Sequence, residues 1–295
     1  MNIKNYCTRV IAGICAMVAL TSTLRGEEDA DPRSSGGGSC AKSAYNCVDA
    51  PNPLPKVSTV WIEEMTWMDL RDAIAAGSRT VVIPTGGIEP NGPWLALGKH
   101  DYAVRATCEA IVRKLKNALC APVIAFVPAG GIDRGVGAIR IGEQTFEALV
   151  TDIATDMKTQ GLERIILIGD HGGNQEGLKA VAERLSGTWG GKPAIVYIPE
   201  YYSSWEGADA LLLKEGVSKK GVEDGIHDDP ASTFHMMLID PHSVRYDERV
   251  ALGKATINGV SIADRAKDLR WGREIVEYRA SVTVEAINKA LAGSK

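Results

Sequence analysis

Short, continuously apolar runs alternate with helix-like segments between residues 66 and 199. The runs are RTVVIP (79–84), APVIAFVP (121–128), RIILIG (164–169) and PAIVYIP (193–199). Strands that are apolar at nearly every position are buried on both faces, which is typical of parallel sheets covered by helices. The pattern therefore predicts an α/β fold, a three-layer α/β/α arrangement around a mostly parallel central sheet.

The segments between the runs have the spacing of amphipathic helices. Thr66 can cap a helix that ends before Gly77, and apolar residues recur at the helical period from Phe146 to Met157. Further helices are expected over residues 101–118, 177–185 and about 263–291. The first helix precedes the first strand, and each of the others lies between two strands or follows the last one, as a parallel sheet requires.

The N-terminal residues are typical of an exported protein. In residues 1–26, Lys4 and Arg9 precede an apolar stretch that is too short to span a bilayer, which indicates a secretory signal peptide. A buried N-terminal helix is the alternative. Residues 27–58 are rich in Gly, Ser, Pro and acid, and predict a flexible linker before one domain over residues 59–295. We expect a periplasmic or extracellular protein without a membrane span after signal removal.

Export also affects how the cysteines are interpreted. Four of the six cysteines lie beyond the predicted signal peptide, and an even number in an oxidising compartment permits disulfides. Cys40 and Cys47 form the natural local pair. Cys108 and Cys120 flank a predicted helix, so they could form a second disulfide or be buried thiols.

The charge of the chain bears on its partners. The net charge is -4, and no basic run occurs among the 295 residues. This composition argues against a nucleic-acid-binding surface and leaves a small molecule as the expected ligand.

Histidines and acids gather where ligands bind in parallel sheets, just beyond the carboxyl ends of the strands. Glu89 follows the first apolar run, and His171 follows the third in the segment LIGDHGGNQEG (167–177). His100 lies beside Asp101 at the start of a predicted helix. Imidazole and carboxylate are ligands of Zn²⁺ and Mn²⁺. We therefore predict one divalent ion held by Glu89, His100 and His171, with Asp101 as a further candidate ligand.

Other residues near the strand ends are candidates for catalysis or substrate binding. The candidate catalytic groups are His227, Glu200 as a general base, and Asp170, which we expect to orient His171. The candidate substrate-binding residues are Asn91, Trp94, Asn174 and Tyr201. Several of the candidate site residues have a structural alternative. Glu89 could cap a turn, Asn174 could cap the following helix, and the aromatic residues could serve packing.

Three segments resemble conserved motifs of the creatininase (creatinine amidohydrolase) family. GGIEPNGPWLALGKHD (86–101) is similar to G-x-T-E-Q-H-G-P-H-L-P-L-x-T-D, GDHGGN (169–174) to N-G-H-G-G-N, and GIHDDPASTFHMM (225–237) to H-A-G-x-x-E-T-S. The resemblance covers about residues 60–250. It implies an α/β/α hydrolase, often hexameric, that uses a metal pair and a metal-bound water to open cyclic amides or cleave other C–N bonds. Glu89 and His171 would be metal ligands.

The chain departs from the family motifs at three positions where the family carries a histidine or an acid. Asn91 stands where the family has a ligand histidine, His100 falls on the position of the bridging aspartate, and Ser232 replaces an acid. These departures favour one metal ion over two and argue against creatinine as the substrate. The resemblance thus predicts a metal-dependent amidohydrolase acting on a small cyclic amide, assembled as a homo-oligomer such as a hexamer.

Two other hypotheses remain open. The departures also suit a non-catalytic small-molecule-binding protein on the same fold. A hydrolase with a metal-free nucleophile is the third alternative, but the chain has no G-x-S-x-G motif.

Overall fold

The computed structural model describes residues 40, 43–128, 136–191, 194–221, 225, 227 and 229–293, and the chain divides into the units Met1–Pro55 and Lys56–Lys295. The first unit contains the short 3-10 helix η1 (Ala44–Asn46), capped by Ser43. Cys40 and Cys47 form a disulfide, the local pair that the sequence favours. The predicted signal peptide lies outside the described residues.

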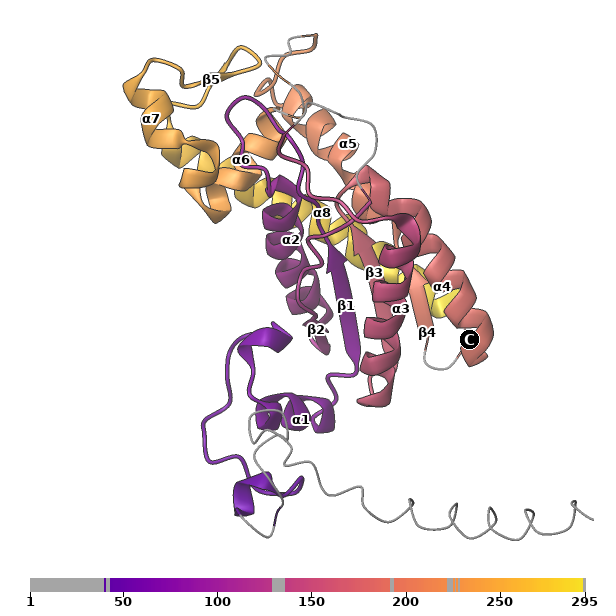
Figure 1. Cartoon of the computed structure of the whole chain (residues 1–295). Helices are drawn as coiled ribbons and strands as arrows, with labels where there is room; N and C mark the ends of the chain where they lie inside the picture. The colour runs from indigo at the N-terminus through magenta and orange to yellow at the C-terminus, as the bar shows by residue number, and fades with distance from the viewer. Residues whose placement is uncertain are drawn as a thin grey trace, which may run out of the picture. The chain divides into compact units, whose positions relative to one another are not determined.

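The second unit is built on a parallel sheet of four strands in the order β2-β1-β3-β4 (Figure 1). The strands are β1 (Thr80–Thr85), β2 (Ala118–Cys120), β3 (Arg164–Gly169) and β4 (Ala194–Tyr197). The pairing of β1 with β3 runs from Thr80↔Arg164 to Thr85↔Gly169, so both strands end together. The loops that follow β1 and β3 therefore leave the sheet side by side.

Helices cover both faces of the sheet, which confirms the three-layer prediction. The helices are α1 (Trp67–Ala75), α2 (Lys99–Leu115), α3 (Glu143–Thr159), α4 (Gln175–Trp189), α5 (Pro199–Lys214), α6 (Pro230–Ile239), α7 (Tyr246–Ala251) and α8 (Arg265–Gly293). Val81 of β1 packs in one core with α3 and α4, whereas its neighbour Val82 packs in another with α2, α5 and α8. Successive residues of a strand point to opposite faces, so an unbroken apolar run fills two cores.

A third core lies beyond the sheet. It joins α5, α6 and α8 to α7 and to the hairpin of β5 (Thr256–Ile257) and β6 (Val260–Ser261). The 3-10 turns η2 (Ile62–Glu64), η3 (Gly172–Asn174) and η4 (Pro241–Val244) complete the connections. A second disulfide joins Cys108 of α2 to Cys120 at the end of β2, which resolves the alternatives left open for this pair.

Two segments differ from the sequence-based prediction. The run 121–128 is not a continuous strand: β2 ends at Cys120, and the run keeps only isolated bridges such as Thr85↔Ile124. Pro122 offers no N–H to a ladder, which is a physical reason for the interruption. No helix was predicted for EYYSSW (200–205), the segment after the last apolar run, but it forms the first turns of α5. Pro199 occupies the first helical position there and suits a helix start.

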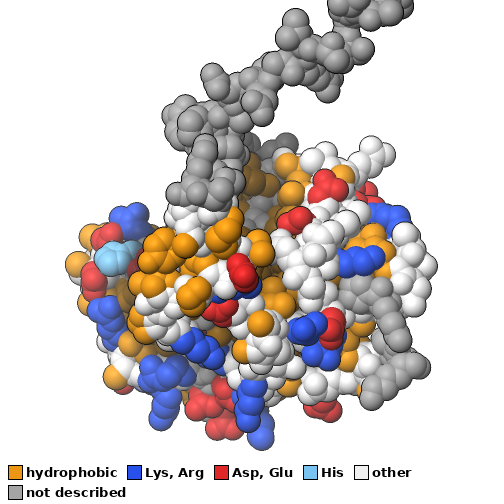
Figure 2. Space-filling view, turned by 90° about the horizontal axis from the view of Figure 1, so that it is seen from below, with side chains coloured by type: hydrophobic (Ala, Val, Ile, Leu, Met, Phe, Trp, Pro, Cys, Tyr) orange, Lys and Arg blue, Asp and Glu red, His pale blue; other side chains and the backbone are white. Residues whose placement is uncertain are grey.

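The surface of the second unit is mixed in charge. On the face seen in Figure 2, lysine and arginine side chains are interspersed with acidic and hydrophobic ones. Among the described residues, none of the helices combines the length and apolar character needed to cross a membrane.

Asp268 of α8 is a buried acid without a hydrogen-bond partner. Its side chain is fully buried, and both carboxylate oxygens lack a partner among the described residues. Burial raises the pKa of Asp268 from its ordinary value of 3.8 to about 7. The folded chain therefore keeps a proton there that the unfolded chain releases at lower pH. This group favours folding below pH 3.8 and loses that effect as the pH rises to about 7.

We expect an Asp268→Asn variant to become more stable relative to the unmodified chain as the pH rises. Between about pH 5 and pH 8.5, the difference in unfolding free energy should change by about 2–3 kcal/mol, since one pKa unit is worth about 1.4 kcal/mol. Urea unfolding at both pH values measures it, with exposed Asp152→Asn as the control. A difference that does not change with pH would contradict this assignment.

Candidate metal centre

Glu89 lies at the centre of a buried cluster of polar side chains at the carboxyl ends of β1 and β3. Its Oε1 is 2.8 Å from Nε2 of His100, and its Oε2 is 2.9 Å from Nε2 of His171. Glu89 follows β1, His100 is the second residue of α2, and His171 follows β3. All three side chains are buried. Two regions of the chain, residues 89–100 and the turn after β3, thus bring one carboxylate and two imidazoles together.

Glycines allow the segments to approach this closely. A Cβ at Gly86 would lie 1.9 Å from Oδ1 of Asp101, and a Cβ at Gly173 would lie 1.9 Å from the carbonyl oxygen of Pro128. A side chain at Gly86 would push the loop that carries Glu89 away from α2, and one at Gly173 would push the loop that carries His171 away from Pro128. The glycines on either side of the site residues are therefore needed for close packing of the backbone.

Imidazoles surround the carboxylate of Glu89. Burial opposes its charge, but hydrogen bonds from His100, His171 and His227 hold the pKa of Glu89 well below its ordinary value. Nδ1 of His227 lies 2.9 Å from Oε1 of Glu89, and 38% of the His227 side chain is exposed. His227 also has a φ of +52°, a left-handed conformation that is uncommon for a residue other than glycine. It is the most accessible of the three imidazoles.

His171 is oriented by the turn that follows it. Its Nδ1 accepts a hydrogen bond from the backbone N–H of Gly173 at 3.0 Å, in the 3-10 turn η3. In this arrangement Nε2 carries the ring proton and donates it to Glu89. Coordination of an ion by Nε2 would therefore require that proton to leave.

Asp170 orients His100 and not His171, contrary to the expectation from the sequence. Its Oδ1 is 2.7 Å from Nδ1 of His100. His171 has an extended backbone, with φ -98° and ψ 143°. Neighbouring residues in extended chain point to opposite sides, so Asp170 reaches Nδ1 of His100 while the His171 ring contacts Glu89.

The other oxygen of Asp170 binds two donors from the opposite side. Oδ2 accepts hydrogen bonds from the Tyr201 hydroxyl at 2.8 Å and from Nη2 of Arg279 at 2.9 Å. Arg279 lies on α8, and both Asp170 and Arg279 are fully buried. Burial opposes the charge of Asp170, but the Arg279 guanidinium and His100 hold the pKa of this carboxyl well below its ordinary value.

Arg279 was not among the residues predicted from the sequence. A signal is present, however: α8 has a fully buried row with a spacing of four residues, and Arg279 stands in it between apolar and hydroxyl residues. The row consists of Ile275, Arg279, Thr283 and Ile287. A charged residue on the buried face of a helix is expected to have an ionic partner.

Three predicted residues lie next to the cluster but outside it. Asp101 accepts a hydrogen bond from the Gly87 N–H at 2.9 Å and is not grouped with the candidate ligands. Asn91 donates from Nδ2 to the carbonyl oxygens of Glu89 and Ala96. Asn174 precedes α4, but its side chain makes no capping bond there. Its Nδ2 instead donates to Oγ1 of Thr85 at 2.8 Å and holds the end of β1.

The remaining candidates lie behind or beside the site. Tyr201 is fully buried against Asp170, and Trp94 is half-buried with the Arg249 guanidinium 5.5 Å from its ring centre. Glu200 is exposed in the first turn of α5. None of the three lines the cavity described below.

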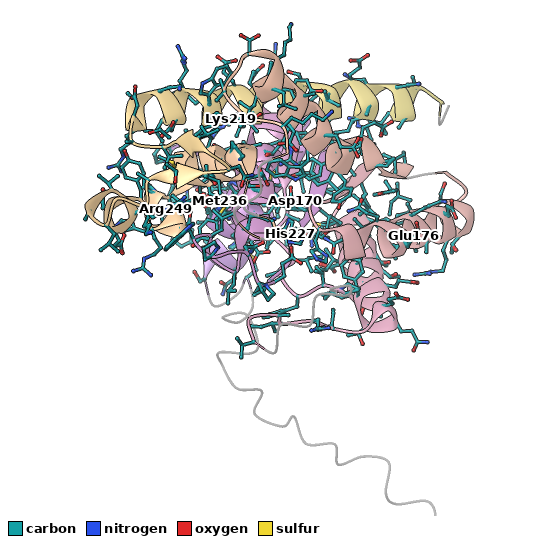
Figure 3. The ribbon with its side chains drawn as sticks, turned by 90° about the horizontal axis from the view of Figure 1, so that it is seen from above. Asp170, Glu176, Lys219, His227, Met236 and Arg249 are labelled. Atoms are coloured by element: carbon teal, nitrogen blue, oxygen red, sulfur yellow. A yellow bond between two sulfur atoms is a disulfide. The ribbon has the colours of Figure 1, made fainter. Side chains whose placement is uncertain are left out.

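A cavity of about 500 Å³ opens onto the cluster. It is lined by the candidate ligands, by Asp170 and by His227. The other lining residues come from the start of α2, the turn after β3, α5 and the start of α6: Lys99, Gly172, Gly173, Tyr202, Ser203, Trp205, Glu206, Asp209, Asp229 and Ser232. Figure 3 shows Asp170 and His227 close together near the middle of the view, well apart from Arg249. The cavity is large enough for a small molecule.

The chemistry of the cluster fits a divalent cation. Glu89, His100 and His171 each offer one ligand atom, and these atoms lie within 4.8 Å of one another. Among the described residues, this is the one group of histidines and acids with such spacing. One carboxylate and two neutral imidazoles form a donor set that suits ions such as Zn²⁺ or Mn²⁺ and leaves coordination positions open.

Comparisons with known proteins identify the family of the chain. A curated creatinine amidohydrolase from Pseudomonas putida is 23% identical over 118 residues, 38% of this chain and 45% of the relative, so the match spans less than half of that relative's length. Solved structures of a Mn creatininase and of a mutant creatininase of Zn-Zn type each match with a TM-score of 0.59 and 19% identity. Both alignments cover 79% of this chain and 98% of the other. The family model described as creatinine amidohydrolase matches residues 63–281, and the chain therefore belongs to the creatininase family.

Proposed function

We propose that the chain is a metal-dependent hydrolase of a small cyclic amide or a related non-peptide C–N bond. The observation that carries this proposal is the meeting of Glu89, His100 and His171 at the floor of a 500 Å³ cavity, beyond the carboxyl ends of parallel strands. Membership of the creatininase family supports it. A divalent ion bound there would supply a Lewis acid for the carbonyl and an activated water as nucleophile.

The side chains around the cluster suit this reaction. His227 contacts Glu89 and keeps part of its ring exposed at the cavity. It is positioned to pass a proton to the nitrogen that leaves when the C–N bond breaks. Asp170, with both oxygens engaged in hydrogen bonds, holds His100. Tyr202 and Trp205 provide aromatic wall for a small ring.

One ion per site is favoured over two. Asn91, at the position of a ligand histidine in the family motif, uses its amide nitrogen for backbone carbonyls. Ser232, at the position of an acid, donates its hydroxyl to Asp229 at 2.9 Å. With neither a second imidazole nor a second acid at these positions, creatinine is not the substrate that we propose.

Export and assembly are also part of the proposal. The charge and apolar pattern of residues 1–26 supports secretion to the periplasm or beyond. The family resemblance supports a homo-oligomer, with a hexamer as the expected form. Sizing of the mature chain by light scattering tests the second point.

Metal analysis and hydrolysis assays test the proposed function together. We expect the purified chain to hold about one Zn²⁺ or Mn²⁺ and to open a cyclic amide or imide from a panel, with activity lost on chelation and restored by the ion. A non-catalytic binding protein would instead be thermally stabilised by a ligand without turnover, and this stabilisation would survive His171→Ala. Absence of bound metal, together with hydrolysis that resists chelators, would refute the proposal.

A further inference from the structure

A continuous set of buried contacts links α8 to the candidate metal centre. Nη2 of Arg279 donates to Oδ2 of Asp170, and Oδ1 of Asp170 accepts from Nδ1 of His100. Nε2 of His100 then faces Glu89 at 2.8 Å. One side chain on the C-terminal helix thus reaches a candidate ligand through one carboxylate.

We propose that Arg279 is a positioning residue for the metal centre, which acts through Asp170 to fix the ring of His100 with Nε2 toward the ion. This inference rests on the proposed function, because it assumes that His100 is a ligand. Arg279 is not itself a cavity-lining residue and has no hydrogen bond to a candidate ligand. Its effect on His100 therefore has to pass through a neighbour, and Asp170 is the neighbour that contacts His100.

Packing alone does not account for an arginine at this position. The same buried row of α8 contains Ile275 and Ile287, and an apolar residue at 279 would avoid the desolvation of a guanidinium. Arg279 is instead held on several sides. Nε donates to Oγ of Ser204 at 3.0 Å, and the guanidinium carbon lies 3.7 Å from the ring centre of Trp205. The fork of donors is therefore fixed in one orientation.

This fixed fork determines the orientation of the Asp170 carboxylate. Arg279 and the Tyr201 hydroxyl both donate to Oδ2, which leaves Oδ1 directed at His100. A carboxylate that accepts from Nδ1 holds the imidazole in the tautomer whose Nε2 can coordinate, and it raises the basicity of that nitrogen. Without Arg279, the carboxylate could rotate and the ring of His100 would lose its fixed position.

Two departures from the family motifs meet in this contact. His100 occupies the position of an aspartate, and Asp170 occupies the position of the glycine before the histidine in N-G-H-G-G-N. In this chain, Nδ1 of His100 and Oδ1 of Asp170 lie 2.7 Å apart. The family motif has a carboxylate at position 100. In this chain the carboxylate is that of Asp170, which contacts His100 and is held by Arg279.

The affinity for Zn²⁺ tests the inference without relying on turnover. Competition with a coloured chelator should show that Arg279→Met binds Zn²⁺ about 10–100-fold more weakly than the unmodified chain. Arg279→Lys should recover part of the loss, because it keeps a donor but not the planar fork. Tyr201→Phe removes one donor to Oδ2 and keeps the ring, so it should weaken binding by a smaller factor.

Arg249→Met is the matched control for the loss of a buried arginine. Arg249 is also almost fully buried, but it donates to the carbonyl oxygens of Lys254 and Thr256, away from the site (Figure 3). We expect this variant to lose stability and to keep its affinity for Zn²⁺. The visible spectrum of bound Co²⁺ should change in Arg279→Met and stay the same in Arg249→Met.

The outcomes separate the two proposals. If the unmodified chain binds Zn²⁺, and Arg279→Met and Arg249→Met bind it as tightly as the unmodified chain does, the role of Arg279 is purely structural. The inference then fails while the proposed function stands. If the unmodified chain takes up no ion, the proposed function fails and the inference fails with it. If Arg279→Met does not fold, unchanged affinity and spectrum in both Tyr201→Phe and Arg279→Lys overturn the inference.

Discussion

Replacing Glu89 by glutamine is expected to remove the bound ion and to lower hydrolysis by at least about a thousandfold, or about 4 kcal/mol of transition-state stabilisation. Glu89 is the one acid of the candidate ligand set, and its two oxygens face two different imidazoles. Glutamine keeps the shape of the side chain but removes the negative charge that attracts and balances a divalent cation. Metal content after gel filtration and the initial rate at saturating ion measure the two effects.

Glu206→Gln is the matched control for this experiment. Glu206 lines the same cavity but does not belong to the ligand set, so its loss should leave the metal content unchanged. A Glu89→Gln variant that retains a full equivalent of ion would show that the two histidines bind it without the carboxylate. The central position of Glu89 would then be structural.

Replacing Asp170 by alanine is expected to lower the free energy of unfolding by about 3–5 kcal/mol. Asp170 is fully buried and is the ionic partner of Arg279, which is fully buried as well. Removing the carboxylate leaves a guanidinium without a counter-charge in the interior, and it also leaves the Tyr201 hydroxyl and Nδ1 of His100 without an acceptor. Chemical denaturation monitored by tryptophan fluorescence gives the free energy.

The double variant Asp170→Ala with Arg279→Met isolates the charge effect. Because both buried charges are absent, it should be less destabilised than the sum of the two single variants by about 1–3 kcal/mol. Additive losses would indicate that the pair contributes through packing and not through its charges.

The sheet could be predicted where the amino-acid pattern has only one physical interpretation. Runs such as VVI and IIL in β1 and β3 fill two cores at once, so they predict central parallel strands without knowledge of the tertiary structure. The run 121–128 has the same apolar character, but Pro122 interrupts its ladder and β2 ends earlier. The helix α5 was missed because polar and aromatic residues at its start, beginning with Glu200, are typical of a loop.

The candidate site shows the same division between local and long-range information. Glu89 and His171 could be identified because they follow apolar strands and lie within two residues of a glycine, and His100 because of the motif around it. The contact between Asp170 and His100 could not be predicted, since it depends on which side of an extended chain each residue faces. The pairing of Asp170 with Arg279 spans 109 residues, and no local pattern connects the two.

The turn after β3 has a consequence for how the site would respond to an ion. The Gly173 N–H donates to Nδ1 of His171, so this nitrogen carries no proton in the structure. A neutral imidazole that coordinates through Nε2 carries its proton on Nδ1, where two N–H groups would oppose each other. Binding of an ion through Nε2 of His171 would therefore break the hydrogen bond from the Gly173 N–H. The environment of the Gly173 amide would then report whether the ion is bound.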